Sequence, residues 1–262
     1  MIGMFDSGLG GLSVWRQLVR TLPHESVLYL ADQGYCPYGE RSQAQIIARA
    51  EVITDYLLAQ GATLLLIACN TATSAAVRHL RARYPQLPIV GMEPAIKPAV
   101  QATQSGRVGV LATRATLAGS KFRELAEQFR QQAQIVCQPG EGFVELVESG
   151  ELASQQARDT VSQSLAPLLA AGVDHVVLGC THYPFLAPLL RDLLPAHIDL
   201  IDPSDAVVRQ TARLLTQHQL AAPADAAAAY RFVSTGDTGC MQTFMRQILG
   251  RDDAVEYLPL AG

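Results

Sequence analysis

Lysine is scarce in this chain, with only Lys97 and Lys121 among 262 residues. An enzyme that uses pyridoxal phosphate needs a lysine for its Schiff base, so the scarcity weighs against that class without excluding it. Clusters of basic residues are also absent, and the net charge is −4. Proteins that bind nucleic acid usually carry a basic stripe, and we therefore expect no nucleic-acid partner.

Long apolar runs are missing too. No stretch reaches the roughly 18–20 apolar residues that a membrane-spanning helix needs. The start of the sequence, Met1-Ile2-Gly3-Met4-Phe5-Asp6, lacks the basic region of a signal peptide. We therefore expect a cytoplasmic protein with no membrane partner. Hydrophobic residues make up 49% of the chain, enough to build the core of one large or two small domains.

Closely spaced cysteines, the usual sign of a structural metal site, do not occur. The five cysteines are Cys36, Cys69, Cys137, Cys180 and Cys240, and no two lie within four residues of each other. We therefore expect no metal. Disulfides are rare in cytosolic proteins, so reduced thiols are expected. Each thiol is then either buried and inert or catalytic.

Short apolar runs alternate with amphipathic helical patterns along the whole chain. Strands are expected at 2–5, 26–30, 63–68, 89–91, 107–112, 134–137, 175–179, 199–201 and 230–234. Helices are expected between them, among others at 11–21, 43–60, 73–84, 116–132, 155–171 and 205–219. Continuous apolar strands separated by helices indicate an α/β protein with mostly parallel sheets flanked by helices.

The two halves of the pattern resemble each other. In each half a strand ends in small polar residues, and a later strand ends in a cysteine that is followed by a helix, a proline, a short strand and another proline. This repetition predicts two similar α/β domains. The first is expected to span residues 1–95 plus 206–262, because the tail resembles the start of neither half, and the second to span residues 96–205.

The matched cysteines, Cys69 and Cys180, are the most informative residues. Each ends an apolar run and is followed by small hydroxylic or polar residues, Asn70-Thr71 and Thr181-His182. Ligands of open α/β sheets bind at the carboxyl ends of the strands, and a helix start favours a thiolate. A base from each half suits the movement of a proton from one side of a carbon atom to the other.

A glycine-rich loop, Asp6-Ser7-Gly8-Leu9-Gly10-Gly11, follows the first expected strand. Its backbone N–H groups beside a helix start could bind a small carboxylate or phosphate, and the alternative is a turn without a ligand. Asp6 and His182 are candidate partners for the two thiols, since a nearby acid or base sets the protonation of a thiol.

Taken together, these motifs resemble the glutamate racemase family, within the wider aspartate/glutamate racemase group. The matching pieces are Asp6 to Gly11, Pro37 to Glu40, Ala68 to Ala72, Glu93 to Ala95, Ala112-Thr113 with Thr116, Phe143 to Glu148, and Leu178 to Pro184. They run in family order over nearly the whole chain. Several short motifs in correct order are far more specific than any one of them.

The resemblance implies two α/β domains with the active site in the cleft between them. It implies interconversion of L- and D-glutamate without a cofactor or metal, to supply D-glutamate for peptidoglycan synthesis. Cys69 and Cys180 would exchange the Cα proton, Asp6 would assist Cys69, and Glu148 and His182 would assist Cys180. Substrate-binding residues would be Asp6, Ser7, Tyr38, Gly39, Asn70, Thr71, Thr113, Thr116, Thr181 and His182.

Some choices stay open on the sequence. The stretch 138–143 is richer in glycine than is usual in the family, so Glu145 competes with Glu148. A racemase acting on aspartate or a hydantoin, a Cys-His hydrolase built on Cys180 and His182, and a non-catalytic binding protein are the rival functions. Glutamate is the expected small-molecule partner, and a homodimer is a possible assembly.

Overall fold

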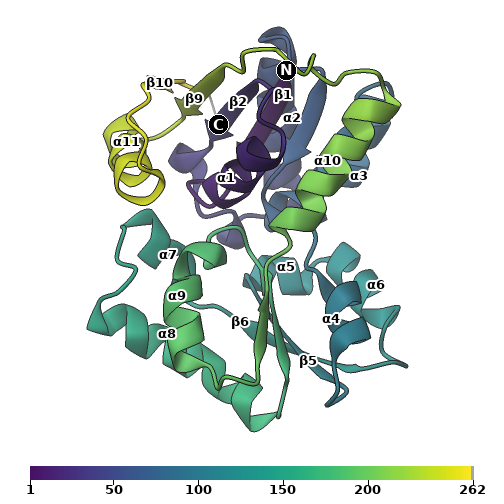
Figure 1. The fold of residues 1–262 in the computed structure, drawn as a ribbon, viewed down its shortest axis with the longest axis vertical. Coiled ribbons are helices and arrows are strands. Elements are labelled where there is room, and N and C mark those ends of the chain that lie inside the picture. Colours follow the sequence, from purple (N-terminus) through teal and green to yellow (C-terminus); the bar gives the residue numbers. More distant parts are fainter. Residues whose placement is uncertain (261–262) are drawn as a thin grey trace. The chain divides into compact units, whose positions relative to one another are not determined.

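The computed structural model describes residues 1–260, and its internal contacts divide the chain into two compact units (Figure 1). The first unit comprises Met1–Met92 together with the residues from Ser204 onward, and the second comprises Glu93–Pro203. No helix among the described residues is long and apolar enough to cross a membrane. Each unit is a parallel sheet flanked by helices.

The first unit holds a six-stranded sheet in the order β10-β9-β2-β1-β3-β4, and every pairing in it is parallel. Its strands are β1 (Ile2–Asp6), β2 (Val27–Ala31), β3 (Leu64–Ile67), β4 (Ile89–Gly91), β9 (Tyr230–Ser234) and β10 (Val255–Tyr257). All residues of β1, β2 and β3 are buried. Burial on both faces explains why these segments read as continuous apolar runs.

Helices of the first unit cover both faces of this sheet. They are α1 (Leu12–Thr21), α2 (Gln43–Ala59), α3 (Asn70–Arg83), α10 (Ser204–Gln217) and α11 (Thr238–Phe244), with 3₁₀ turns η1 (Gln33–Tyr35) and η2 (Tyr38–Glu40) and a π-helical turn η4 (Met245–Leu249). Helix α2 packs on α3, and α1 packs on α10, which runs beside it in Figure 1. Ser42 and Gln45 form a reciprocal capping box that starts α2.

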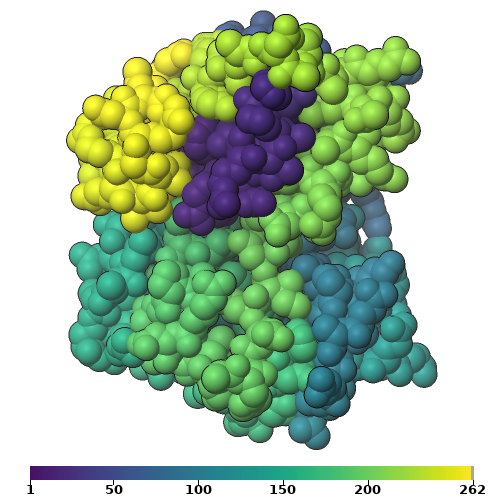
Figure 2. Space-filling model, viewed as in Figure 1, coloured from purple at the N-terminus to yellow at the C-terminus, as the bar shows by residue number. Residues whose placement is uncertain are grey.

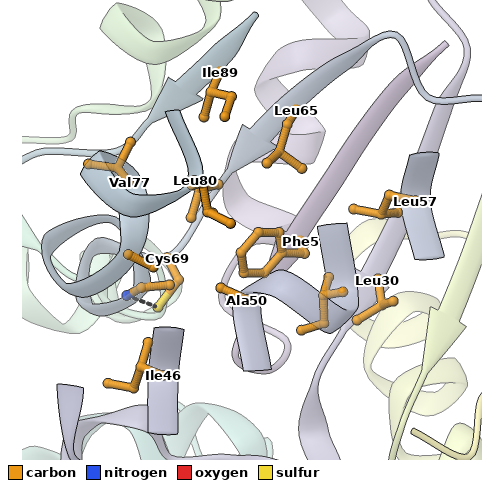
Figure 3. Packing of buried hydrophobic residues seen from close by; sticks show 14 of the residues in the cluster. Phe5, Leu30, Ile46, Ala50, Leu57, Leu65, Cys69, Val77, Leu80 and Ile89 are labelled. Atoms are coloured by element: carbon orange, nitrogen blue, oxygen red, sulfur yellow. Dashed lines mark hydrogen bonds between the residues drawn. The ribbon is translucent and has the colours of Figure 1, made fainter. Parts of the chain in front are cut away.

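One hydrophobic cluster fills the space between the sheet and the helices α2 and α3. Figure 3 shows Phe5 and Leu65 from the strands facing Ala50 of α2 and Leu80 of α3. Cys69 belongs to the same cluster, at the point where β3 gives way to α3. The thiol is therefore held by the packed core of the first unit rather than by a surface loop.

The C-terminal segment returns to the first unit, where it lies beside the N-terminal segment (Figure 2). Strand β9 pairs with β2, and Trp15 of α1 makes edge-on contacts with Tyr230 and Phe232 of β9. Strand β10 was not predicted from the sequence; it is only three residues long and follows the polar stretch 251–253. A strand this short leaves too little alternation to recognise.

The second unit holds a four-stranded parallel sheet in the order β6-β5-β7-β8. Its strands are β5 (Arg107–Ala112), β6 (Gln134–Pro139), β7 (His175–Gly179) and β8 (Asp199–Ile201). Its helices are α4 (Ile96–Ala102), α5 (Arg114–Ala118), α6 (Ser120–Glu127), α7 (Phe143–Glu148), α8 (Gln155–Ala170) and α9 (Ala187–Leu193), with the 3₁₀ turn η3 (Tyr183–Leu186). A separate core cluster joins β5 and β7 to α4 and α6.

The two units share one strand order, since β2-β1-β3-β4 in the first corresponds to β6-β5-β7-β8 in the second. This confirms the predicted α/β class with two similar parallel-sheet domains. Cys69 and Cys180 follow the corresponding strands β3 and β7. One expected helix was wrong in detail: the segment 116–132 contains two short helices, because Gly119 between them is extended and favours helix poorly.

Candidate active site

The glycine-rich loop after β1 is fixed by hydrogen bonds to both backbone groups of Gly8. Asp6 is fully buried, and its Oδ1 accepts the N–H of Gly8 at 2.9 Å. The Tyr29 hydroxyl donates to the carbonyl of Gly8 at 2.7 Å. A Cβ at Gly11 would lie 2.7 Å from the Cβ of Asp6 and 2.8 Å from the Tyr29 hydroxyl, so this position requires glycine. The loop therefore presents Ser7 in a set position.

Cys69 is the N-terminal capping residue of α3. Its Sγ accepts the N–H of Ala72 at 3.4 Å, the hydrogen bond drawn in Figure 3. The thiol also donates to the Ser7 hydroxyl oxygen at 3.6 Å, which joins the cysteine to the glycine-rich loop. Only 4% of the residue is exposed. An N–H donor at a helix start stabilises the thiolate form, which is the form that accepts a proton.

Asn70 and Thr71, the next two residues, are buried in the first turn of α3. Neither the amide nitrogen nor the amide oxygen of Asn70 has a hydrogen-bond partner within the described part of the chain. A buried amide without partners costs free energy, roughly 1–3 kcal/mol per group. A polar ligand that binds both atoms would remove this cost, which fits the substrate-binding role expected for Asn70.

Cys180 in the second unit has a different neighbour. The residue is 7% exposed, and its Sγ lies 3.7 Å from Nδ1 of His182. The Nε2 of His182 donates to the Glu148 carboxylate at 2.6 Å. The turn after β7 thus brings together two residues that a regular helix would point in different directions. Glu148 at the end of α7, rather than Glu145, makes the contact with the imidazole.

The charge state of His182 follows from these contacts. Burial alone would lower its pKa, but the hydrogen bonds to Cys180 and Glu148 outweigh burial and raise the pKa of His182 well above its ordinary value. The raised pKa favours the protonated, imidazolium form of this side chain. A cation hydrogen-bonded to a thiol favours the thiolate, so each unit supports its cysteine by a different means.

Tyr183 anchors the turn that carries Cys180 and His182 to the segment that precedes and starts α7. Its hydroxyl donates to the carbonyl of Gly140 at 3.2 Å, and its ring packs edge-on against Phe143 with centroids 4.9 Å apart. A Cβ at Gly140 would lie 2.5 Å from the Tyr183 hydroxyl. The glycine-rich stretch before α7 therefore serves close packing against this turn, and Thr181 within the turn is buried.

Thr113 and Thr116 lie just after the carboxyl end of β5, the strand of the second sheet that corresponds to β1 of the first. Thr113 follows β5, and its hydroxyl oxygen accepts the N–H of Thr116 at 3.2 Å, which caps α5. The Thr113 hydroxyl donates to the Thr116 hydroxyl at 3.0 Å. Both residues lie at the carboxyl end of a strand that pairs directly with β7, where the expected substrate-binding residues gather.

Tyr38 and Gly39 form the turn η2 in the first unit. The Tyr38 hydroxyl donates to the carboxylate of Asp32 at 2.7 Å, and Arg49 and Thr235 bind the same carboxylate. The sequence patterns do not predict Asp32 as the partner of Tyr38, nor Arg49 and Thr235 as the partners of Asp32. A signal for two of them was present, since Asp32 and Thr235 are polar residues directly after or near the end of an apolar strand, as Asp6 is. Arg49 lies within a helix, where no pattern distinguishes it.

Comparison with known proteins decides the family. Residues 2–211 match the family model described as Asp/Glu/Hydantoin racemase. This chain belongs to the Asp/Glu/hydantoin racemase family. The resemblance found in the sequence is thereby confirmed. A glutamate racemase of Ectopseudomonas mendocina is 52% identical over 254 residues, which are 97% of this chain and 96% of the relative.

Solved structures of the family have the same fold. A glutamate racemase of Escherichia coli in complex with L-glutamate and the activator UDP-MurNAc-ala is 35% identical, with a TM-score of 0.86 over 100% of this chain and 99% of that one. A glutamate racemase of Francisella tularensis in complex with D-glutamate is 26% identical, with a TM-score of 0.86 over 98% and 96%. Within residues 1–260 no group of His, Cys, Asp and Glu could hold a metal ion.

Proposed function

We propose that this chain interconverts L- and D-glutamate. The observation that carries the proposal is the pair of buried thiols at corresponding strand ends, each with its own support for a thiolate. Membership of the racemase family and the 52% identity to a glutamate racemase support glutamate as the substrate. The two related structures contain L-glutamate in one case and D-glutamate in the other, as expected of an enzyme that handles both.

In the proposed reaction one cysteine is a thiolate and the other a thiol. The thiolate takes the proton from Cα, and the electron pair of the broken C–H bond remains on the substrate as a carbanion delocalised into its carboxylate. The thiol then gives its proton to the opposite face of Cα. The two cysteines thereby exchange protonation states, and the configuration at Cα is inverted. No cofactor is required, because each half of the transfer has a thiol to carry it.

The neighbours of each thiol have distinct proposed roles. On one side, Ser7 and the Ala72 N–H orient Cys69, and Asp6 assists it through the loop that holds Ser7. On the other side, the imidazolium of His182, fixed by Glu148, supports Cys180. The carbanion state has to be stabilised by hydrogen-bond donors, and removing one such donor typically costs about 3–4 kcal/mol in comparable sites.

Substrate binding is assigned to polar groups at the strand ends of both units. The unpartnered amide of Asn70 is the strongest candidate in the first unit. The remaining candidates are Asp6, Ser7, Tyr38, Gly39, Thr71, Thr113, Thr116, Thr181 and His182. Supply of D-glutamate for peptidoglycan, in the cytoplasm, is the role typical of the family and belongs to the same proposal.

The test is to incubate the purified protein with L-glutamate alone under reducing conditions and to measure D-glutamate by chiral chromatography. We expect D-glutamate to accumulate until both enantiomers are equally abundant. Cys69→Ala and Cys180→Ala should each abolish this conversion while leaving the circular dichroism spectrum unchanged. Near wild-type turnover by either variant would contradict the use of two thiols.

A Cys-His hydrolase is a second candidate, because Cys180, His182 and Glu148 stand in the order of a nucleophile, its base and an orienting acid. That reading leaves Cys69 without a chemical role. The same preparation decides between them. A covalent acyl adduct on Cys180 after incubation with an amide or ester of glutamate, which supplies the leaving group, together with no D-glutamate formed from L-glutamate, would favour hydrolysis; the adduct is seen by mass spectrometry.

A further inference from the structure

The buried carboxylate of Asp32 is the centre of a polar cluster in the first unit. Asp32 is fully buried, and Arg49 binds both of its oxygens, with Nε at 2.8 Å and Nη2 at 2.7 Å. The Tyr38 hydroxyl donates to Oδ2 at 2.7 Å, and the Thr235 hydroxyl donates to Oδ1 at 2.7 Å. We call Asp32, Tyr38, Arg49 and Thr235 the Asp32 cluster.

The cluster joins segments that are far apart in the sequence. Asp32 follows β2 and Thr235 follows β9, which lies beside β2 with Ala31 paired to Ser234. The hydroxyl oxygen of Thr235 also accepts the N–H of Gly34 at 3.0 Å. Arg49 comes from α2 and donates through Nη1 to the carbonyl of Leu260 at 3.3 Å. The C-terminal segment thus supplies one member of the cluster, Thr235, and contacts another, Arg49, through Leu260. Thr235 and Leu260 both lie beyond the residues that match the family model.

Stability alone is a poor explanation for such a cluster. Removing a carboxylate and a guanidinium from water is costly, and apolar side chains of similar size often stabilise a fold as well or better. A buried ion pair with several hydrogen bonds does, however, fix the position of the groups bound to it. Here the bound groups include the hydroxyl of Tyr38, whose pKa is raised well above its ordinary value by burial and by Asp32, so that it stays a donor.

The position of Tyr38 indicates which segment the Asp32 cluster holds in place. Tyr38 and Gly39 form a short turn at the carboxyl edge of the sheet, and a turn of this length has few hydrogen bonds of its own. The ring of Tyr38 packs edge-on against Tyr35, and the guanidinium groups of Arg41 and Arg49 lie over the Tyr35 ring. The turn is therefore held in place by the Asp32 cluster and by Tyr35.

We propose that Asp32, with Arg49 and Thr235, positions the Tyr38–Gly39 turn for the substrate, and that the C-terminal segment thereby takes part in substrate binding through Thr235. This inference rests on the proposed function, because it takes the turn to contact glutamate. Asp32 acts through Tyr38 and is a positioning residue. Its loss should weaken the binding of both enantiomers more than it slows proton transfer.

The test compares Asp32→Asn with a control from the other end of the same strand. Glu25 precedes β2, is also buried, and accepts the N–H of Ala222 in the C-terminal segment at 2.7 Å. Both substitutions replace a buried carboxylate by an amide of the same shape. We expect Asp32→Asn to raise KM for L- and D-glutamate by about tenfold with a smaller change in kcat, and Glu25→Gln to leave KM unchanged.

A milder pair keeps the test valid if Asp32→Asn does not fold. Thr235→Val removes the hydroxyl and should raise KM, whereas Thr235→Ser keeps it and should restore the wild-type value. Combining Asp32→Asn with Tyr38→Phe should raise KM by less than the product of the separate effects, because Asp32 acts through the Tyr38 hydroxyl.

The outcomes separate the inference from the proposed function. If the wild-type protein does not racemise glutamate, the proposed function fails and this inference fails with it. If the wild type is active and a folded Asp32→Asn variant keeps the wild-type KM, only the positioning role is overturned. An equal rise of KM in Glu25→Gln, or identical values in Thr235→Val and Thr235→Ser, would also overturn it.

Discussion

The carboxylate of Glu148 has an effect on His182 that can be measured. Its hydrogen bond helps to raise the pKa of the imidazole, so the imidazolium persists above the pH at which an ordinary histidine loses its proton. In Glu148→Gln the negative charge is gone, and the pKa of His182 should fall. We expect the alkaline limb of the kcat/KM profile to move to lower pH, with a loss of about tenfold near neutral pH.

A control for this prediction lies one turn earlier on the same short helix. Glu145 belongs to α7, and the contact with the imidazole is made by Glu148. Glu145→Gln removes the same charge from the same helix, and we expect its profile to follow the wild type. The measurement is kcat/KM for glutamate from pH 6 to pH 10 for all three proteins. An equal shift in both variants would mean that any negative charge on α7 raises the pKa of His182, and that the hydrogen bond to Glu148 has no specific effect.

Residue types were predictable where chemistry and position coincide, as for Cys69 and Cys180 at the ends of apolar runs. Asp32 and Thr235 were missed because their importance arises from strand pairing between segments some 200 residues apart. Glu148 could not be chosen over Glu145 from sequence, because the choice depends on how α7 packs against the turn η3. Contacts of this kind exist only once the chain is folded.

At the scale of elements, the two cysteine turns differ although their strands correspond. A 14-residue helix starts after Cys69, whereas Cys180 is followed by the 3₁₀ turn η3 and only then by α9. The reason is visible in the sequence: Pro188 has no N–H to donate to the carbonyl of Pro184, which an α-helix would require. The N–H of Ala187 binds that carbonyl instead. This geometry allows His182 to reach the sulfur of Cys180.

Asp174 joins elements at the other end of the second sheet, the amino end of β7. Its carboxylate accepts hydrogen bonds from the Thr103 hydroxyl and from the N–H groups of Gln104 and Ser105, which connect α4 to β5. Burial alone would raise the pKa of Asp174, but the hydrogen bonds from His175 and from this connection lower it well below its ordinary value. The ionised carboxylate thus stabilises the fold.

We expect Asp174→Asn to reduce the free energy of unfolding by roughly 1.5–3 kcal/mol at pH 7, the usual contribution of a hydrogen bond to a charged group. A lowered pKa contributes stability above the unfolded value near pH 4, and this contribution is lost as the pH falls further. The difference between wild type and variant should therefore shrink from pH 5 to pH 3. Urea unfolding followed by circular dichroism measures it.

Asp199 provides the control for this pH dependence. Its carboxylate lies 3.7 Å from the imidazole of His175 in the same unit, but its side chain is 80% exposed. Asp199→Asn should change stability by a few tenths of a kcal/mol at most, because exposed ion pairs contribute little. A destabilisation by Asp174→Asn that stays constant between pH 5 and pH 3 would show that shape, and not charge, explains the effect.

At the scale of the whole molecule, each of the two units with one strand order carries one of the proposed catalytic thiols, Cys69 or Cys180, and the two are supported by unlike groups. The reaction proposed for them is symmetric, since L- and D-glutamate are mirror images of equal free energy in water. The ratio of kcat/KM in the two directions must therefore equal unity for the wild type and for every variant. The different groups that stabilise Cys69 and Cys180 can therefore affect only the relative heights of the barriers to the two proton-transfer steps.

The kinetic isotope effect of a substrate deuterated at Cα shows which of the two proton transfers limits the rate. When Cys180 abstracts the proton, weakening its support in Glu148→Gln makes abstraction more rate-limiting, and the isotope effect on kcat/KM should rise. In the other direction Cys69 abstracts and Cys180 donates, so the slow step moves to donation and the isotope effect should fall. Ser7→Ala, which removes the hydroxyl beside Cys69, should produce the opposite pattern. Isotope effects that change alike in both directions would mean that a single base serves both enantiomers, because only separate bases let a one-sided substitution distinguish them.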